Sequence, residues 1–521
     1  MKRLLFALLA LSTLLLAGCG GGTTQKPTGG LDFIKYPIET DETLTYWMPL
    51  NPNVAQSAVS LGDTPFGKQL MKDTGIKIDF IHPPAGQEGE QWGLMMTSSN
   101  LPDLFLASWL NYSKALDDGV LIPLNDLIES DAPNFKKYLA DNPEIDKLIR
   151  REDGFYDCIP FIRGDESLLS YYGPMLRGDW LEDLGLDVPE TIDEWYNVLT
   201  RFKNEKNAEA PLSYVAGPMF GFNEFIGAFG ISVGFFVEDG KIVYGSADPR
   251  YKDFLTEFAK WYAEGLIDAN IANVDDKTLD TNILTNKTGA TCSWGTWNKW
   301  ATAGQEKDPR FKLVPAPHVT LVKGTVPEFG QKDGWVPGDN CVGITRSCKN
   351  PKLAMRFLDY AFSEEGYNLY NFGIKGESYN IVDGEPVFTD LILNNPDDLS
   401  PGQAMGRYMM SSYGGPFVQA RQANDQNYPL PEQKKALEIW PKVNTDAHRV
   451  PKFTFAPDEQ DEYTAIMGNV NTLASEMMIK FIMGIEPMDN FDKYISDLKR
   501  YNIERVIEIL QAAYDRYISA Q

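Results

Sequence analysis

The sequence Leu44-Thr45-Tyr46-Trp47-Met48 opens the pattern that decides the fold class. Its β-branched and aromatic residues predict a strand. Residues 65–74 follow with a helical pattern that ends at Gly75, and residues 76–80 alternate apolar with polar side chains as a second strand. Residues 101–106 predict a third short strand after a turn. Because strands and helices alternate along the chain, the sequence predicts an α/β lobe with a parallel sheet.

A chain of 521 residues is too long for one hydrophobic core, so two lobes are expected. Thr191-Ile192-Asp193-Glu194 is a capping box that opens a helix, and residues 289–294 predict a strand in the second lobe. Apolar faces over residues 491–498 and 503–517 predict a helical C-terminal region. We assign residues 41–158 and 315–365 to lobe 1, and residues 159–314 and 366–521 to lobe 2.

The composition indicates an acidic globular protein. Apolar residues make up 43% and aromatic residues 12%, and 48 basic against 73 acidic side chains leave a formal net charge of −25. This charge argues against a nucleic-acid partner and against adhesion to anionic lipid. Cys158, Cys292, Cys341 and Cys348 are too few for a disulfide framework. A Cys341–Cys348 bridge stays open as an alternative, although buried thiols are favoured.

The N-terminal residues are typical of a lipoprotein export signal. Met1-Lys2-Arg3 supplies positive charge, residues 4–16 are apolar, and Leu16-Ala17-Gly18-Cys19 resembles the bacterial lipobox. The apolar run is shorter than the about 20 residues that span a bilayer. We predict a signal peptide over 1–18, a lipidated (palmitate-bearing) Cys19 and a flexible tether over 19–40 on the outer face of a cell membrane. An ordinary cleaved signal with an incidental cysteine is the alternative.

Motifs for catalysis and metal binding are missing from the sequence. His82, His318 and His448 stand far apart, and no Cys/His spacing fits zinc. Residues 62–69 approach a phosphate-binding loop but carry a glutamine where a hydroxyl should hold magnesium. A carboxylate pair for glycoside hydrolysis, such as Asp165-Glu166, cannot be located among 73 acidic residues. We predict no catalytic residue, no metal and no cofactor.

Tryptophans fall at the predicted carboxyl ends of strands, where α/β sheets bind ligands. An aromatic ring can cover the apolar face of a sugar while polar side chains bind its hydroxyl rim. Trp294 and Trp297 are the strongest candidates because they flank a glycine in a loop. Core packing is the alternative for each of them. The other candidates are Trp47, Asn51, Trp109, Trp335 and Arg177, which either pairs with a uronate carboxylate or forms a salt bridge inside its lobe.

Short motifs spread along the chain carry a family resemblance. They are residues 100–104 (NLPDL), 153–156 (DGFY), 176–186 (LRGDWLEDLGL), 265–268 (GLID), 362–366 (FSEEG), 481–484 (FIMG) and 512–517 (AAYDRY). Their order and span make the set specific. With them, almost the whole mature chain resembles the bacterial family 1 extracellular solute-binding proteins, the lipid-anchored receptors of ABC importers, and most of all the branch associated with oligosaccharide uptake.

The resemblance implies a periplasmic-binding-protein-like fold of two α/β lobes, with ligand bound in an interlobe cleft and a hinge that closes on it. It also implies that Trp294 stacks on a sugar ring and that Tyr379 approaches the cleft. Many relatives hold calcium in a loop after the helix that the capping box opens. Residues 202–212 lack the alternating oxygen ligands of such a loop, so no calcium is expected there.

The predicted function is capture without chemistry. We predict a monomeric, lipid-anchored substrate-binding protein that takes up a carbohydrate, an oligosaccharide in particular, by aromatic stacking and hinge closure. Its partners are then the carbohydrate, the permease subunits of an ABC transporter and, through the lipid anchor, the membrane. A surface glycoside hydrolase or lyase and a peptide-binding receptor are the alternatives.

Overall fold

Four strands form the sheet of the first lobe, in the order β10-β3-β1-β2. β1 (Thr43–Trp47) pairs in parallel with β2 (Lys77–Ile81) and β3 (Leu104–Leu106), and β10 (Val342–Ile344) pairs with β3 in antiparallel. The predicted parallel unit is confirmed, with one antiparallel strand at its edge. The computed structural model describes residues 34–97, 100–107, 111–151, 153–337, 341–397, 399–410, 414–451 and 457–519, so the predicted signal peptide and Cys19 lie outside the described residues.

Helix α2 (Pro65–Thr74) shows how local sequence builds this lobe. The hydroxyl of Thr64 accepts a hydrogen bond from the amide of Gly67 (3.0 Å), and Gly75 ends the helix at a φ of +75°. Phe66 and Leu70 are buried in a core shared with β1 and α14. The other helices here are α1 (Pro52–Ala55), α3 (Glu88–Thr97), α4 (Tyr112–Asp117), α5 (Asn125–Asp131), α6 (Pro133–Asp141), α7 (Pro143–Ile149) and α14 (Pro351–Asp359).

A three-stranded sheet in the order β8-β5-β9 lies at the centre of the second lobe. β5 (Tyr172–Arg177) pairs in antiparallel with β8 (Ala290–Trp294) and with β9 (Leu313–Pro315). The predicted capping box is present, because the hydroxyl of Thr191 accepts a hydrogen bond from the amide of Glu194 (3.2 Å) at the start of α9 (Ile192–Lys206). The other helices are α8 (Gly178–Leu184), α10 (Ala216–Gly221), α11 (Pro249–Ala263), α12 (Asp276–Leu284), α13 (Asn298–Lys307) and α19 (Pro431–Ile439).

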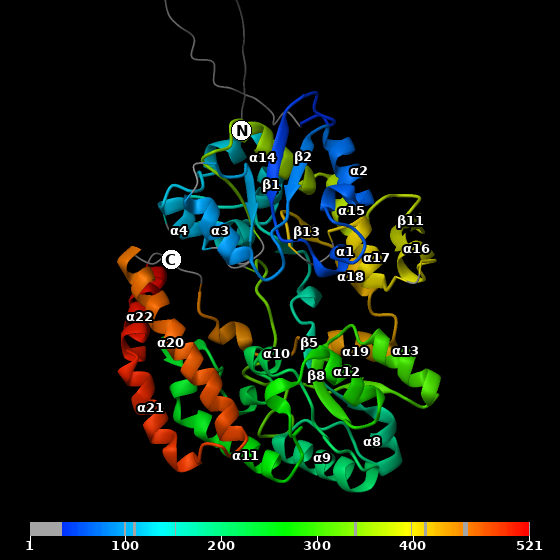
Figure 1. The fold of residues 1–521 in the computed structure, drawn as a ribbon, viewed down its shortest axis with the longest axis vertical. Coiled ribbons are helices and arrows are strands. Elements are labelled where there is room, and N and C mark those ends of the chain that lie inside the picture. Colours follow the sequence, from blue (N-terminus) through cyan, green and yellow to red (C-terminus); the bar gives the residue numbers. More distant parts are fainter. Residues whose placement is uncertain are drawn as a thin grey trace, which may run out of the picture. The chain divides into compact units, whose positions relative to one another are not determined.

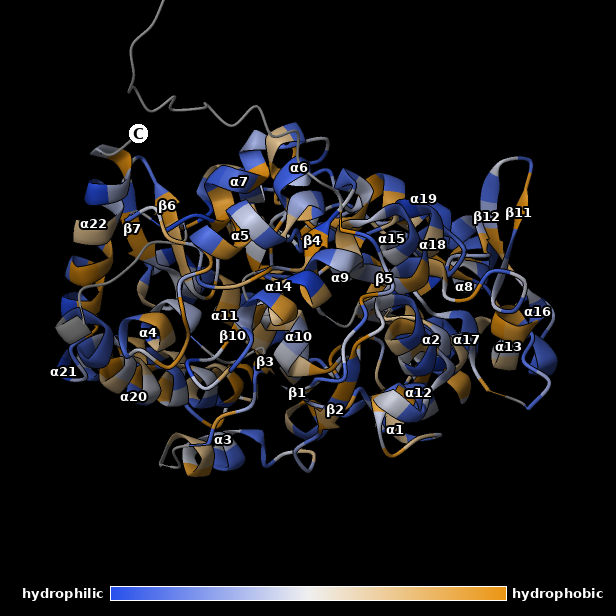
Figure 2. Ribbon diagram, turned by 90° about the horizontal axis from the view of Figure 1, so that it is seen from above, coloured by the Kyte–Doolittle hydropathy of each residue, from blue (hydrophilic) through white to orange (hydrophobic). Residues whose placement is uncertain are grey.

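The C-terminal region is helical, as predicted. Helices α20 (Pro457–Ile482), α21 (Phe491–Arg500) and α22 (Ile503–Ser519) lie side by side, coloured orange to red in Figure 1, and α20 packs on α11. The hairpin of β6 (Phe235–Glu238) and β7 (Lys241–Tyr244) contacts α22. Figure 2 shows hydrophobic and hydrophilic residues mixed along α21 and α22, as expected for helices that bury one face. Within the described ranges, no helix has the length and apolar character needed to cross a bilayer.

Two segments lie in a different lobe from the one predicted. The sequence pattern places residues 366–425 in lobe 2, but α15 (Glu364–Phe372) and α17 (Pro401–Tyr408) pack on α2 in the first lobe. Residues 315–331 were assigned to lobe 1, but Ala316, Val319 and Phe329 are buried in the core of the second. Local patterning identifies an element without identifying its packing partner, which explains both differences. The remaining elements of the first segment are β11 (Tyr379–Val382), β12 (Glu385–Phe388), α16 (Asp390–Leu393) and α18 (Arg421–Asp425).

Three segments that cross between the lobes meet at one place. β4 (Ile162–Arg163) pairs in parallel with β13 (Val418–Gln419). On its other side, the amide of Arg163 donates a hydrogen bond to the carbonyl of Trp335 (2.8 Å). Short crossing strands of this kind are where hinge-bending proteins absorb a change in backbone angle.

The thiol of Cys348 is not a reactive one. Cys348 is a free thiol and forms no bridge to Cys341, so the disulfide alternative is not adopted. Burial, followed by the negative charge of Asp103, raises the pKa of Cys348 to about 12. A thiol with such a pKa is almost fully protonated at neutral pH and is a poor nucleophile.

Replacing a buried carboxyl should flatten the pH dependence of stability. Asp359 is 1% exposed and accepts hydrogen bonds from the amide of Phe135 (2.8 Å) and from Asn134 (2.7 Å), and burial raises its pKa to about 7. An unfolded aspartate titrates near about pH 4, so the folded state binds more protons above that pH, and stability falls as the pH rises to about 7. We expect the free energy of unfolding, measured with urea, to fall between pH 5 and pH 8 by on the order of 3 kcal/mol more in the wild type than in Asp359→Asn. Equal falls in the two proteins would contradict this role of Asp359.

Candidate functional site

A cluster of four aromatic side chains forms a platform at the end of β8. Trp294 is 44% exposed and stacks on Tyr171, with ring centroids 5.6 Å apart and planes at 9°. Its edge contacts come from Tyr172 (5.4 Å, 81°) and Phe222 (5.8 Å, 85°). Because Tyr172 lies opposite Trp294 in the β5–β8 register, the sheet itself brings these rings together. The aromatic platform is therefore supported from within the lobe while part of the indole stays open to solvent.

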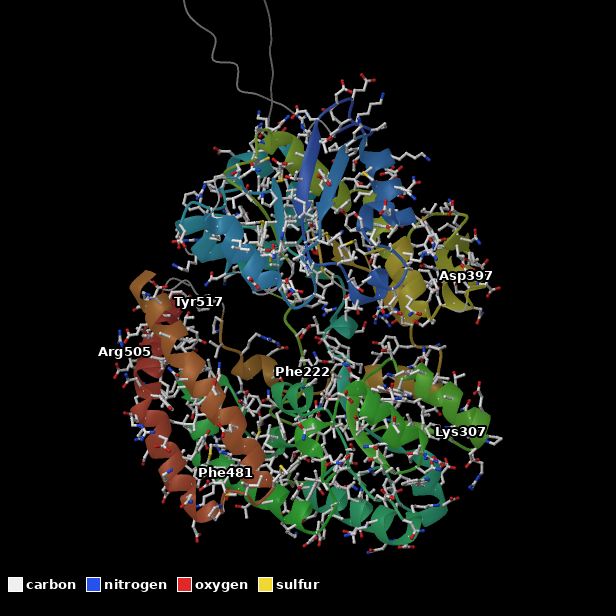
Figure 3. All side chains as sticks on the ribbon, in the orientation of Figure 1. Phe222, Lys307, Asp397, Phe481, Arg505 and Tyr517 are labelled. Atoms are coloured by element: carbon white, nitrogen blue, oxygen red, sulfur yellow. The ribbon has the colours of Figure 1, made fainter. Side chains whose placement is uncertain are left out.

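A cavity of about 290 Å³ adjoins the platform and shares Phe222 with it. Figure 3 labels Phe222, which directly follows α10. One wall of the cavity is the turn after α10, another is the segment 329–333, and a third comes from residues 445–450. The lining residues are Gly221, Phe222, Asn223, Ser232, Phe235, Phe236, Phe329, Gly330, Gln331, Lys332, Asp333, Thr445, His448, Arg449 and Val450. Aromatic walls combined with amide, hydroxyl and charged groups fit a polar ligand that has apolar faces.

A hydrogen-bond network joins the platform to the crossing segments. The carboxylate of Asp333 accepts hydrogen bonds from the hydroxyl of Tyr171 (2.8 Å) and from the guanidinium of Arg163 (3.0 Å). Arg163 also donates to the side chain of Gln419 (2.7 Å). The side-chain oxygen of Gln331 accepts a hydrogen bond from the backbone amide of Tyr171 (2.7 Å). Any movement of the crossing segments is thus coupled to the ring on which Trp294 stacks.

The cationic side chains at the cavity have carboxylate partners. Lys332 lies 2.8 Å from Asp446, and Arg449 lies 2.7 Å from another oxygen of the same carboxylate. Burial acts to raise the pKa of Asp446, but hydrogen bonds from Lys332 and Arg449 outweigh it and hold that pKa below its ordinary value. His448 contacts Glu328 at 2.9 Å. Charge at the cavity is therefore largely neutralised within the protein.

The structure places the predicted site residues in different surroundings. Trp294 lies in the platform, and Trp335 is 38% exposed beside the crossing strands. Trp47 and Trp297 are 2% and 1% exposed, the former stacked on Phe105 and the latter against Trp440, so both pack in cores. Tyr379 is buried on β11, Asn51 caps α1 by accepting a hydrogen bond from the amide of Asn53 (2.8 Å), and Trp109 lies outside the described residues.

Arg177 has the internal salt bridge that the sequence offered as its alternative. Its guanidinium donates to both carboxylate oxygens of Asp179, at 2.8 and 2.6 Å, and it is 2% exposed. Its charge also lies over the rings of Trp180 (4.7 Å) and Phe311 (4.2 Å). A bidentate, stacked arginine of this kind is a structural element of the second lobe, and the geometry gives no support to a uronate contact.

Several residues of the site were not found from the sequence. Tyr171, Phe222, Arg163, Gln331 and Asp333 come from four separate parts of the chain and meet only through folding. A partial signal was available for one of them, because Asp333 belongs to the loop that carries Trp335. No local pattern marks the other four, since neither residue type nor spacing separates them from ordinary core and surface positions.

Comparison with known proteins identifies the family. The family model described as bacterial extracellular solute-binding protein matches residues 59–368. The chain belongs to this family. Solute-binding proteins capture their solute without transforming it, so this solute-binding protein is not an enzyme.

Individual relatives match the solute-binding protein along nearly its full length. The fructooligosaccharide ABC transporter substrate-binding protein FusA of Streptococcus pneumoniae is 24% identical, over 98% of this chain and 97% of its own. The lipoprotein LipO of Bacillus subtilis is 23% identical, over 97% of each chain. The crystal structure of the alginate-binding protein AlgQ2 aligns with a TM-score of 0.74 at 26% identity, covering 91% of this chain and 99% of that one. These matches confirm the two-lobed solute-binding fold.

The loop after α9 differs from a calcium loop in its chemistry. Asn207 caps the helix at a φ of +56°, and the following Ala208, Ala210 and Leu212 are buried. Buried apolar side chains at these positions offer no oxygen ligands. Among the described residues, no group of three or more His, Cys, Asp or Glu side chains could hold a metal ion.

Removal of divalent metal should leave the thermal stability of this solute-binding protein unchanged. We expect thermal unfolding in 5 mM EDTA and in 5 mM CaCl₂ to give midpoints within about 1 °C of each other. A cation that binds only the native state would separate the two midpoints, because at 100 times its Kd it stabilises the fold by about 2.7 kcal/mol. A second measurement is metal analysis of the dialysed protein. One equivalent of calcium retained per chain would contradict the prediction.

Proposed function

We propose that this solute-binding protein is the extracytoplasmic substrate-binding component of an ABC transporter and that its solute is an oligosaccharide. The observation that carries the proposal is the half-exposed indole of Trp294, supported by Tyr171, Tyr172 and Phe222 beside a cavity of about 290 Å³. A pyranose or furanose ring presents C–H groups to an aromatic face and hydroxyls at its edge. The cavity supplies amide and hydroxyl groups for that edge.

The relatives support a carbohydrate as the solute. The curated relative FusA is named for fructooligosaccharides, and a solved FusA structure, with a TM-score of 0.75 at 22% identity, contains kestose. AlgQ2 is named for alginate, and another relative, YtcQ of Bacillus subtilis, for polygalacturonan and rhamnogalacturonan. Both neutral and acidic glycans occur among these names, so the charge of the solute has to be argued from this chain.

The paired charges at the cavity favour a neutral sugar. A uronate carboxylate would need a cation to compensate its loss of water, and Arg163, Lys332 and Arg449 are each engaged by a carboxylate of the protein. Taking Arg163 would leave Asp333 without its cation, in a pair whose side chains are only 11% and 21% exposed, and taking Lys332 or Arg449 would remove one of the two cations that share Asp446. Neutral hydroxyls can join such a network as additional donors and acceptors without breaking it.

Capture is completed by closure at the crossing segments. Arg163 and Asp333 join those segments to Tyr171, so a ligand that stacks on Trp294 is linked to the hinge through Tyr171, Asp333 and Arg163. Closure of the lobes then excludes water and strengthens the polar contacts. The closed monomer would dock on the permease subunits, while the lipid on Cys19 and the tether keep it near them.

Trp294→Ala should remove most of the sugar affinity. We expect isothermal titration with a neutral oligosaccharide panel, such as fructooligosaccharides and maltooligosaccharides, to show at least tenfold weaker binding, which corresponds to about 1.4 kcal/mol. The control is Tyr501→Ala, since Tyr501 is also exposed (37%) but lies between α21 and α22. Oligogalacturonates should bind the wild type more weakly than the neutral panel. Binding of peptides in place of any sugar, or a preference for uronates, would contradict the proposal.

Cys19→Ala should release the protein from the membrane. Without a thiol to acylate, the tether has no lipid, and a polar chain of this charge has little affinity for a bilayer. In cells expressing the full chain, we expect labelled palmitate in the wild type and in Cys348→Ala, and none in Cys19→Ala. Membrane fractionation should show the same division. A Cys19→Ala protein that stays in the membrane fraction would argue against lipid anchoring.

A further inference from the structure

A buried acid–base pair lies directly behind two walls of the cavity. The carboxylate of Glu224 contacts Nδ1 of His318 at 3.0 Å, and the two side chains are 0% and 2% exposed. The second carboxylate oxygen and Nε2 have no hydrogen-bond partner among the described residues. Burying two such groups costs free energy that an apolar pair of similar volume would not cost. Folding stability alone therefore does not account for the pair.

Glu224 lies within a strained turn that forms the first wall. Asn223 and Phe225, on either side of it, both have a φ of +63°, and Phe225 combines this with a ψ of −42°. A bulky residue at positive φ is costly and persists only where its surroundings hold it. Phe225 is held by Trp195 (4.9 Å) on one side, and Glu224 is held by His318 on the other. The turn directly follows Phe222, whose ring makes a T-shaped contact with Trp294.

His318 supports the second wall. A Cβ atom added to Gly330 would lie 2.6 Å from Cγ of His318, so the backbone of the segment 329–333 rests directly on the imidazole. The two walls also touch each other, because a Cβ atom on Gly227 would lie 2.4 Å from the carbonyl oxygen of Phe329. Asn223 and Gly330 both line the cavity, and the pair connects them on the side away from the cavity, because Glu224 follows Asn223 and His318 contacts Gly330.

The pair also lies near the strand that carries the platform. Burial, followed by the charge of Glu224, raises the pKa of the Cys292 thiol well above its ordinary value. Cys292 lies on β8, two residues before Trp294. Glu224 therefore lies within the turn, reaches the 329–333 wall through His318, and is close enough to the strand that ends in the platform for its charge to act on Cys292.

We propose that Glu224 and His318 are positioning residues of the binding site, which hold the ring of Phe222 and the segment 329–333 in fixed positions relative to Trp294. The pair touches no ligand and acts through the turn and the wall. The proposal rests on the proposed function only for its effect on affinity. Its structural content, the placement of Phe222 against Trp294, holds without ligand and can be measured in the free protein.

The test compares three variants with the wild type. Glu224→Leu fills the same space but removes the hydrogen bond to His318, whereas Glu224→Gln retains an oxygen that can accept from Nδ1–H. Ser213→Ala is the matched control, because it removes a buried hydrogen bond of the same lobe, from Ser213 to Asp268 (2.7 Å), between residues that do not line the cavity. Each variant is made with and without Trp294→Phe, so that the difference spectrum isolates the fluorescence of Trp294.

In the free protein, Glu224→Leu should change the emission spectrum of Trp294 from that of the wild type. Glu224→Gln and Ser213→Ala should both give the wild-type emission spectrum. Affinity for the best-bound neutral oligosaccharide should fall at least tenfold in Glu224→Leu, while Glu224→Gln stays within about threefold of the wild type and Ser213→Ala is unchanged despite a lowered Tm. Gly330→Ala, which crowds the imidazole and leaves the pair chemically intact, should reproduce the emission change if Glu224→Leu does not fold.

Two results would overturn the proposal. One is an unchanged Trp294 emission in both Glu224→Leu and Gly330→Ala. The other is a Glu224→Leu protein with lowered Tm and unaltered affinity, since that is the behaviour expected of the Ser213→Ala control. If the wild type binds no sugar, the emission comparison still decides between these outcomes, so the failure of the proposed function is distinguishable from the failure of the positioning role.

Discussion

The arrangement of the site depends on the side chain of Arg163. Its guanidinium binds Asp333 (3.0 Å) on one crossing segment and Gln419 (2.7 Å) on another, and it lies 5.1 Å from the ring centre of Tyr171 in the platform. Only a planar cation with several fixed donors can make these contacts together. Through them, the segments that cross between the lobes and the ring that supports Trp294 belong to one network.

The same network explains why a protein of strongly negative net charge can have a neutral site. The formal charge of −25 belongs to the whole chain, whereas Lys332 and Arg449 at the cavity both contact Asp446, and Arg163 contacts Asp333, which lines the cavity. Long-range charge keeps the surface soluble and weakly repelled by anionic partners. Under the proposed function, this pairing leaves aromatic stacking and hydrogen bonding as the interactions that discriminate among solutes. The net charge of the chain and the ion pairs at the cavity act independently, because solvent and salt screen exposed charges beyond about 10 Å.

Prediction from the sequence succeeded where the signal was local. The bounds of α2 follow from Thr64, Pro65 and Gly75, and the start of α9 follows from its capping box, because caps and turns are chemistry between near neighbours. The structure places Trp294 at the end of β8 with its ring partly exposed, and its role in ligand binding stays a prediction. Trp47 also ends a strand and Trp297 flanks the same glycine as Trp294, yet both pack in cores, since burial depends on which distant residues lie beside them.

By itself, the sequence determined the alternation of strands and helices, the helical C-terminal region, the family of the chain and one ring of the platform. Those features depend on periodicity and on short-range hydrogen bonds, which are written in contiguous residues. Only the tertiary structure decided that residues 366–425 join the first lobe, that Tyr171, Phe222 and Asp333 gather around Trp294, and that Glu224 meets His318. The contacts that gather side chains around Trp294 join residues up to 162 positions apart, and packing, which no local pattern encodes, selects them.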